Sequence, residues 1–308
     1  MPVLLDTTQA GPTSEVHAAN CVTVGLINNM PDAALQATER QFTDLIRASA
    51  HNTVVRFLLY RIPEIPRGEA ARRDMAGRYR DIAELWDARL DGLIVTGNEP
   101  RTPDLKAEPY WDPFARLIDW ARQHTTSTIW SCLAAHAAVL QSDGIKRRAL
   151  SRKLSGVFDC VPVASHPILR GVALPLRVPH SRGNDLPEQA LKAAGYRILT
   201  RSAATGVDMF ARHEPSFHLF MQGHPEYAAD TLLREYRRDI GRYLRGERAD
   251  YPAMPQGYFG GEALDRIEAF RKRAKADRRG DLLRSFPMRT LEAGLANDWQ
   301  PSAVAIYE

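Results

Sequence analysis

Apolar and polar positions in the first half of the chain follow two alternating periods. Short apolar runs bounded by turn residues predict buried strands, and these runs cover residues 21–28, 54–62, 91–97 and 127–132. Between them, apolar residues spaced i, i+3 and i+4 predict amphipathic helices over residues 34–50, 78–90 and 110–124. Strands that alternate with helices predict an α/β fold with a doubly wound, mostly parallel sheet and helices on both faces.

The second half is less regular. Short strand patterns separated by Pro and Gly cover residues 153–163, 174–182, 195–202, 207–213 and 217–223. We expect them to extend the same sheet in antiparallel fashion, before a helix over 230–246 that Gly246 ends.

The pattern also divides the chain. The first twenty residues lack apolar periodicity and carry Gly, Pro, Thr and Ser. We therefore predict an extended N-terminal segment over 1–20, a main domain over 21–260 and a basic helical segment over 261–308.

Composition and charge narrow the class. With 308 residues, 44% hydrophobic and 25% charged, the chain is typical of a soluble globular protein. The net charge of +4 is local, because eight Lys or Arg and only four Asp or Glu lie in residues 264–285. Such a run is usually a solvated helix face, so we expect no nucleic-acid partner.

Three cysteines, Cys21, Cys132 and Cys160, stand at wide spacings without a C-x-x-C pair. This argues against a disulfide framework and a Cys-rich zinc site, and it favours a reducing cytoplasm. The N-terminus lacks the features of a signal peptide, and no run of about 18 apolar residues occurs, so we expect no membrane insertion.

The candidate nucleophile is Cys132, where the apolar strand STIWS meets the small-residue helix LAAHAAVL. A helix that starts there directs its N–H groups and positive dipole end at the sulfur, which favours a thiolate. Taken alone, Cys132 is better interpreted as a buried core cysteine, and only the second half of the chain reverses that interpretation.

The candidate base lies far downstream, where strand FHLFMQG runs into His224, Pro225 and Glu226. A thiol nucleophile needs a base, and the base needs a third group that orients it. Cys132, His224 and Glu226 supply these types at the ends of predicted strands. For His136 we expect a packing or hydrogen-bonding role, and for Cys21 and Cys160 a structural one; we predict no metal.

Several motifs resemble those of homoserine O-succinyltransferases and their acetyl-transferring relatives. They are NNMPDAALQATERQF, DGLIVTG, PYWDPF, HTTSTIWSCLAAHAAVL, KLSGVFDC, VPHSR and GHPEYAADTLLREYRRD, in order from about residue 21 to 260. The resemblance implies a class I glutamine-amidotransferase-like, flavodoxin-like three-layer sandwich and makes 21–260 a catalytic acyltransferase domain. It implies an acyl group passed from an acyl-CoA co-substrate to Cys132 and then to the hydroxyl of homoserine, with no bound cofactor.

Substrate residues follow by the same motifs. Arg238 would pair with the amino-acid carboxylate, and Lys153 and Ser181 would line the site. Relatives carry lysines just after the Met-Pro pair of the first motif, where this chain has Asp32 and Ala33. We therefore expect the contribution of those lysines to the site to be absent or supplied by other residues.

The choice of acyl donor is expected to depend on the residues that follow the motif DGLIVTG. Relatives read GAP followed by Gly or Glu, whereas this chain reads Asn98, Glu99, Pro100 and Arg101. We expect Arg101 to pair with the far carboxylate of succinyl-CoA, which favours succinyl over acetyl.

Other functions stay open at this point. Acetyl-CoA could be the donor, or serine the acceptor. A glutamine amidotransferase-like hydrolase is disfavoured because Ser131 and Leu133 replace the usual glycines around the cysteine. An inactive binding protein on the same scaffold is a third reading. We expect small-molecule partners and a possible homodimer.

Overall fold

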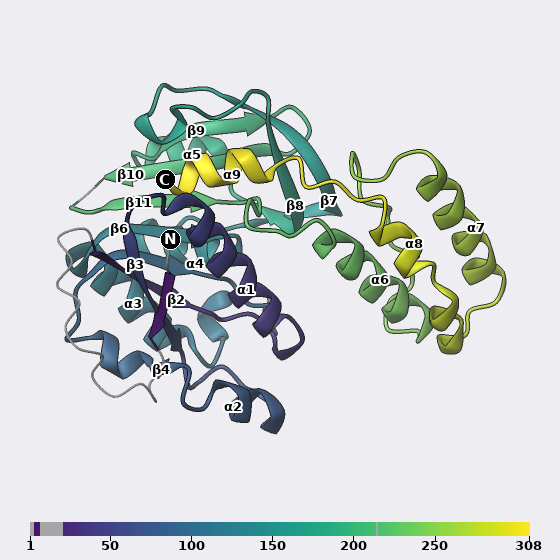
Figure 1. Cartoon of the computed structure of the whole chain (residues 1–308), viewed down its shortest axis with the longest axis horizontal. Coiled ribbons are helices and arrows are strands. Elements are labelled where there is room, and N and C mark those ends of the chain that lie inside the picture. Colours follow the sequence, from purple (N-terminus) through teal and green to yellow (C-terminus); the bar gives the residue numbers. More distant parts are fainter. Residues whose placement is uncertain (1–2, 7–20, 214) are drawn as a thin grey trace.

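The computed structural model describes residues 3–6, 21–213 and 215–308. Within them, eleven strands form one sheet and helices pack around it (Figure 1). The strands are β1 (Val3–Asp6), β2 (Cys21–Ile27), β3 (Val54–Arg61), β4 (Arg80–Asp81), β5 (Leu90–Val95), β6 (Thr125–Ser131), β7 (Arg148–Pro162), β8 (Leu176–Asp185), β9 (Arg197–Ser202), β10 (Gly206–His213) and β11 (Phe217–Met221). The α-helices are α1 (Asp32–Ser49), α2 (Glu69–Met75), α3 (Trp111–His124), α4 (Leu133–Asp143), α5 (Glu188–Ala193), α6 (Thr231–Leu244), α7 (Glu262–Ala276), α8 (Met288–Glu292) and α9 (Gln300–Tyr307).

The sheet changes character at β11. Its strand order is β1-β3-β2-β5-β6-β11-β10-β9-β7-β8, and β4 pairs with β3. Neighbours from β1 to β11 in this order are parallel, as is the β3–β4 pair, and the pairs from β11 to β8 are antiparallel. The predicted α/β class, mostly parallel with an antiparallel extension, is therefore confirmed. Ser131 lies opposite Met221 in the β6–β11 register, so the segments that follow both strands leave the sheet at the same edge.

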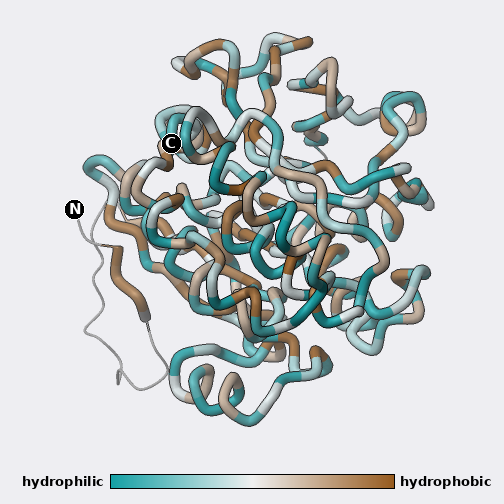
Figure 2. Tube along the Cα trace, turned by 90° about the vertical axis from the view of Figure 1, so that its right-hand side faces the viewer, coloured by the Kyte–Doolittle hydropathy of each residue, from teal (hydrophilic) through white to brown (hydrophobic). Residues whose placement is uncertain are grey.

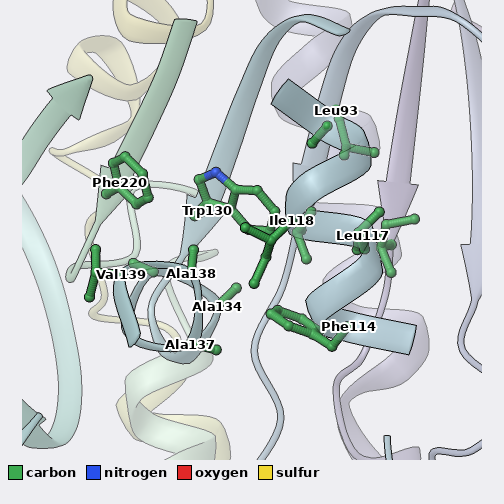
Figure 3. Close-up of a cluster of buried hydrophobic side chains, with 14 of the residues drawn as sticks. Leu93, Phe114, Leu117, Ile118, Trp130, Ala134, Ala137, Ala138, Val139 and Phe220 are labelled. Atoms are coloured by element: carbon green, nitrogen blue, oxygen red, sulfur yellow. The ribbon is translucent and has the colours of Figure 1, made fainter. Parts of the chain in front are cut away.

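Helices cover both faces of the sheet. On one face α1 buries Leu35, Phe42 and Ile46 against β2, β3 and β5. On the other face α3 and α4 pack on Trp130, and Figure 3 shows the α4 alanines facing this ring and Phe220. Small residues on α4 let the helix approach the sheet closely. Hydrophobic stretches run through the interior strands in Figure 2, while the outer loops are largely hydrophilic.

A separate group of helices extends to one side. One hydrophobic cluster joins α6 to α7 and α8 through Ile240, Phe270 and Leu291, and Figure 1 shows these helices projecting from the sheet. After them the chain returns, and α9 packs against α1. The core of this helical lobe therefore begins at α6, before residue 260, and the division predicted at 260 stays a prediction.

Some predicted elements need correction. The α-helix predicted over 78–90 is wrong, because Arg80 and Asp81 instead form β4 beside the end of β3. Asp81 and Glu84 then make a capping box that starts a short 3₁₀ turn over Ile82–Leu85. Helix α2 lies just upstream and was not predicted. Strand β1 lies in the segment 1–20, whose other residues are outside the described part of the chain.

No helix in the described part of the chain is both long enough and apolar enough to cross a membrane.

Candidate active site

Cys132 occupies a sharp turn between β6 and α4. Its backbone has φ 52° and ψ −111°, a conformation that residues with a Cβ rarely adopt. The N–H of Cys132 donates to the carbonyl of Met221 at 2.7 Å, which ties the turn to the end of β11. The partly exposed Cys132 therefore stands at the head of α4, beside the first N–H groups and the positive end of the helix dipole.

Gly97 allows the segment after β5 to pass over this turn. A Cβ on Gly97 would lie 2.5 Å from the Cβ and 3.0 Å from the backbone N of Leu133. Only glycine fits such a close approach. The first N–H groups of α4, which have no partner within the helix, lie in this crowded region beside the thiol.

His224 follows β11 and is held on several sides. Its N–H donates to the carbonyl of Pro179 at 2.8 Å, and its ring stacks on Tyr227 with centroids 4.3 Å apart. Nδ1 lies 2.9 Å from Oε1 of Glu226, and the ring lines the same cavity as Cys132, close enough for the two groups to interact electrostatically. The structure therefore brings Cys132, His224 and Glu226 together at the ends of two neighbouring strands.

The charges around His224 favour its protonated form. Burial alone lowers the pKa of this imidazole, but the nearby charges of Cys132 and Glu226 and their hydrogen bonds raise the pKa well above its usual value. This arrangement supports an imidazolium beside a thiolate. Such a pair can attack a carbonyl carbon and then return a proton to the leaving group.

Two further residues fix the carboxylate and its loop. Oγ of Ser131 donates to Oε1 of Glu226 at 3.3 Å, and Nε1 of Trp299 donates to the carbonyl of Tyr227 at 2.8 Å. Sequence reasoning missed both roles. Ser131 adjoins the candidate nucleophile and could have been suspected, whereas Trp299 stands near the far end of the chain with no local signal.

A cavity of about 930 Å³ opens above the three residues. Its walls come from α1, the segment after β5, the start of α4, the end of β8 and α6. This volume suits a ligand of drug size or larger. Its basic lining residues are Arg40, Arg147, Lys153, Arg182, Arg234, Arg238, Arg242 and Arg248.

Three of the four predicted substrate residues line this cavity: Lys153, Ser181 and Arg238. Nζ of Lys153 lies 2.9 Å from Asp239, and Nε of Arg238 lies 3.3 Å from the same carboxylate. Burial raises the pKa of Asp239, but these two cations outweigh it and lower the pKa. Asp239 therefore holds both basic groups at the cavity wall.

Arg101, by contrast, is not among the residues that line the cavity. Its side chain is exposed, and its backbone N–H donates to Oε1 of Glu108 at 2.6 Å. The loop that carries it folds back on Glu108 because this carboxylate also accepts from the N–H of Thr102 at 2.7 Å. The prediction that Arg101 contacts the acyl group therefore gains no support from the structure.

The segment that contains Asp32 and Ala33 has a structural role of its own. Asp32 accepts from the N–H of Gly68 at 2.8 Å and from Nη1 of Arg67 at 3.2 Å, and Ala33 lines the cavity. Asp32 therefore anchors the loop before α2.

Histidines outside this centre have structural contacts. His136, for which a packing or hydrogen-bonding role was expected, is buried with Nε2 3.0 Å from Oε1 of Gln222, and burial lowers its pKa to about 4. His180, Cys160 and Asp208 form a buried cluster whose ligand-type atoms lie within 4.8 Å of one another. Burial raises the pKa of Cys160, which keeps it a thiol. No spacing in the sequence indicated this cluster, and the expectation that no metal binds stays a prediction.

Known proteins resemble this chain over most of its length. A family model described as "Homoserine O-succinyltransferase" matches residues 7–308. A protein of that name from Rhodopseudomonas palustris is 49% identical, covering 94% of this chain and 87% of the relative. One from Methylorubrum extorquens is 48% identical, covering 92% and 84%. A crystal structure titled glutamine amido transferase, from Methylobacillus flagellatus, covers 94% of both chains with a TM-score of 0.50 and 16% identity, a likeness of fold.

Proposed function

Because the chain belongs to the homoserine O-succinyltransferase family and is an acyltransferase, we propose that it transfers a succinyl group from succinyl-CoA to the hydroxyl of L-homoserine. This is an early step of methionine synthesis. The observation that carries the proposal is that Cys132, His224 and Glu226 line one large basic cavity, with Nδ1 of His224 2.9 Å from Oε1 of Glu226.

The first half of the reaction loads the enzyme. Nδ1 of His224 is turned to Glu226, which leaves Nε2 for the thiol proton of Cys132. The thiolate attacks the thioester carbonyl of succinyl-CoA, and the N–H groups at the head of α4 stabilise the oxyanion. Coenzyme A leaves with the proton from His224, and a succinyl thioester remains on Cys132.

The second half transfers the acyl group. His224 takes the proton of the homoserine hydroxyl, whose oxygen attacks the thioester on Cys132. The carbon–sulfur bond breaks, and the Cys132 thiolate is restored beside the imidazolium. Arg238 would pair with the homoserine carboxylate, and Lys153 and Ser181 would contact the substrate from the facing wall.

The cavity charge suits a polyanionic donor. Its eight basic residues exceed its acidic ones, which are Asp44, Glu99, Glu226, Asp230, Glu235 and Asp239. An excess of cations attracts the phosphates of an acyl-CoA at long range. We expect acyl-CoA as a co-substrate, with no resident cofactor. A cytoplasmic location and a homodimer also stay predictions.

The test is thiol release by the full chain with succinyl-CoA and homoserine, with acetyl-CoA and serine as alternative substrates. We expect CoA release that requires an acceptor for turnover, and a single acyl adduct on Cys132 by intact mass when the acceptor is left out. Cys132→Ala should abolish both signals. Folded protein that releases no CoA with either donor would refute acyl transfer, and glutamine hydrolysis would favour the amidotransferase reading instead.

A further inference from the structure

A succinyl group carries a charge at its far end that the catalytic residues do not neutralise. Once its carbonyl is bound to Cys132, the second carboxylate lies only two methylene groups away. A carboxylate taken into a partly buried cavity is costly unless a cation pairs with it. The question is which cation near Cys132 is free to do so.

Most basic residues that line the cavity already have an acidic partner within 4.0 Å. These are Lys153, Arg182, Arg234, Arg238, Arg242 and Arg248. Among the described residues, the lining cations without an ion pair are Arg40 and Arg147. Arg40 is exposed on α1, whereas Arg147 is half-buried after α4.

Arg147 lines the same cavity as the nucleophile Cys132. Its Nη2 donates to the carbonyl of Pro103 at 3.2 Å, which leaves other N–H groups of the guanidinium for a ligand. Burial lowers the pKa of Arg147, while the charges of Tyr110 and Cys132 oppose that shift. The positive charge of Arg147 also helps to lower the pKa of His136, one turn after Cys132 on α4. The guanidinium therefore lies within electrostatic range of the thiolate.

From these contacts we propose that Arg147 binds the distal carboxylate of the succinyl group and thereby selects a dicarboxylic acyl donor. The inference rests on the proposed function and names the subsite for the acyl tail. A guanidinium fork can meet both carboxylate oxygens, and the tail is held while the thioester forms and breaks.

The acidic residue nearest in sequence to Arg101, where the acyl contact was expected, does not oppose the pairing of Arg147 with the succinyl carboxylate. Glu99 lines the cavity, but both its oxygens accept from Arg242, each at 3.1 Å. The hydrogen bond from Arg242 lowers the pKa of Glu99, so this carboxylate is ionised and already neutralised by its partner. Repulsion of the succinyl tail is therefore weak on that side.

The experiment compares donors in the full chain. Arg147→Met removes the charge but keeps a flexible apolar stem, and Arg147→Lys keeps a charge without the fork. Lys146→Met is the matched control because Lys146 is exposed and does not line the cavity. We measure kcat/KM for succinyl-CoA and acetyl-CoA with homoserine. In Arg147→Met the ratio of the two values should fall about 10- to 100-fold, the worth of one charge-assisted contact. Arg147→Lys should lose less, and Lys146→Met should match the wild type.

The outcomes separate the two proposals. If the wild type uses succinyl-CoA and Arg147→Met lowers kcat/KM equally for both donors, or for neither, the subsite is wrong while the function stands. A wild type that transfers from neither donor overturns the function and the subsite together. Acetylation of Cys132 in Arg147→Met, measured by intact mass, shows that the variant is folded and that only the tail contact has been lost.

Discussion

At the scale of single residues, the centre depends on groups that change one another's protonation. The carboxylate of Glu226 supports a charged His224, and that charge in turn supports the Cys132 thiolate. Each contact alone is an ordinary hydrogen bond, but burial strengthens all of them. A substitution of Glu226 should therefore change the reactivity of the Cys132 sulfur.

Glu226→Gln tests this coupling. An amide no longer stabilises the imidazolium, so the pKa of His224 falls and the ring becomes a weaker partner for the sulfur of Cys132. We expect kcat to fall by about 10²- to 10⁴-fold, as for triads that lose their carboxylate. Alkylation of Cys132 by iodoacetamide at pH 7 should slow as well. Glu247→Gln, an exposed change of equal charge, should leave both rates unaltered; equal effects of the two variants would contradict the coupling.

A second residue-scale prediction concerns acid stability. Burial lowers the pKa of His218 to about 4, and its Nδ1 accepts from Nε1 of Trp130 at 2.9 Å. Between about pH 6.5 and 4 the unfolded chain binds a proton here that the folded chain does not, so stability falls as pH falls, by up to about 1.4 kcal/mol per pH unit.

His218→Asn keeps an acceptor for Trp130 but removes this titration. Its free energy of unfolding in urea, measured at pH 7 and pH 5, should depend less on pH than that of the wild type. The slope is the readout, since the smaller side chain also lowers stability at both pH values. Equal slopes would show that His218 does not titrate this way.

At the scale of elements, the site is made by one crossing: the segment after β5 passes over the first turn of α4. Gly97 permits the contact with Leu133, and Met221 holds the same turn from the side of β11. The position of the thiol is thus set by three strands and not by its own loop.

Gly97→Ala should disturb this crossing. The added methyl group meets the backbone of Leu133, which must move, and overpacking of this kind costs about 1–3 kcal/mol. We expect a lower unfolding free energy in urea and slower acyl labelling of Cys132. Gly260→Ala is the control, because a Cβ there meets open space. Identical behaviour of the two variants would argue against a tight crossing.

The elements also show what sequence can predict. Strands such as β2 and β5 and the helix α1 follow clear apolar periods, so the pattern of apolar residues was enough to predict them. The stretch 78–90 has a helical period, yet backbone pairing of Arg80 with β3 and the cap at Asp81 prevail over it. The triad residues come together because they follow neighbouring parallel strands. Arg101 and Arg147 could not be told apart, since loop backbones decide which of them faces the cavity.

At the scale of the whole molecule, the cavity is closed by parts that are far apart in the chain. Helix α6 forms one wall, and Gln41 on α1 donates to its Thr231 at 2.6 Å. After the helical lobe, the final residues return to the α/β body, where Trp299 is buried behind the loop that carries His224. The last segment therefore supports the centre from behind the His224 loop, and its Asn297 and Gln300 also line the cavity.

Trp299→Phe tests that support. The ring still fills the site, but the carbonyl of Tyr227 loses its buried donor, which costs about 1–3 kcal/mol. We expect lower thermal stability and a lower kcat, because the His224 loop is held less firmly. Trp111→Phe, a similar trimming on α3, provides the comparison. Loss of stability with kcat unchanged would show that Trp299 braces the fold and not the loop.

The backbone conformation of Cys132 predicts which residue related proteins without catalytic activity would carry at this position. Its torsion angles belong to a region that glycine enters freely and other residues enter at a cost of about 1–3 kcal/mol. A lineage released from catalysis would gain folding free energy by replacing cysteine with glycine, which has no Cβ. Cysteine at this position in a related protein therefore indicates continuing selection for catalysis. Glycine at the same position indicates that catalysis has been lost.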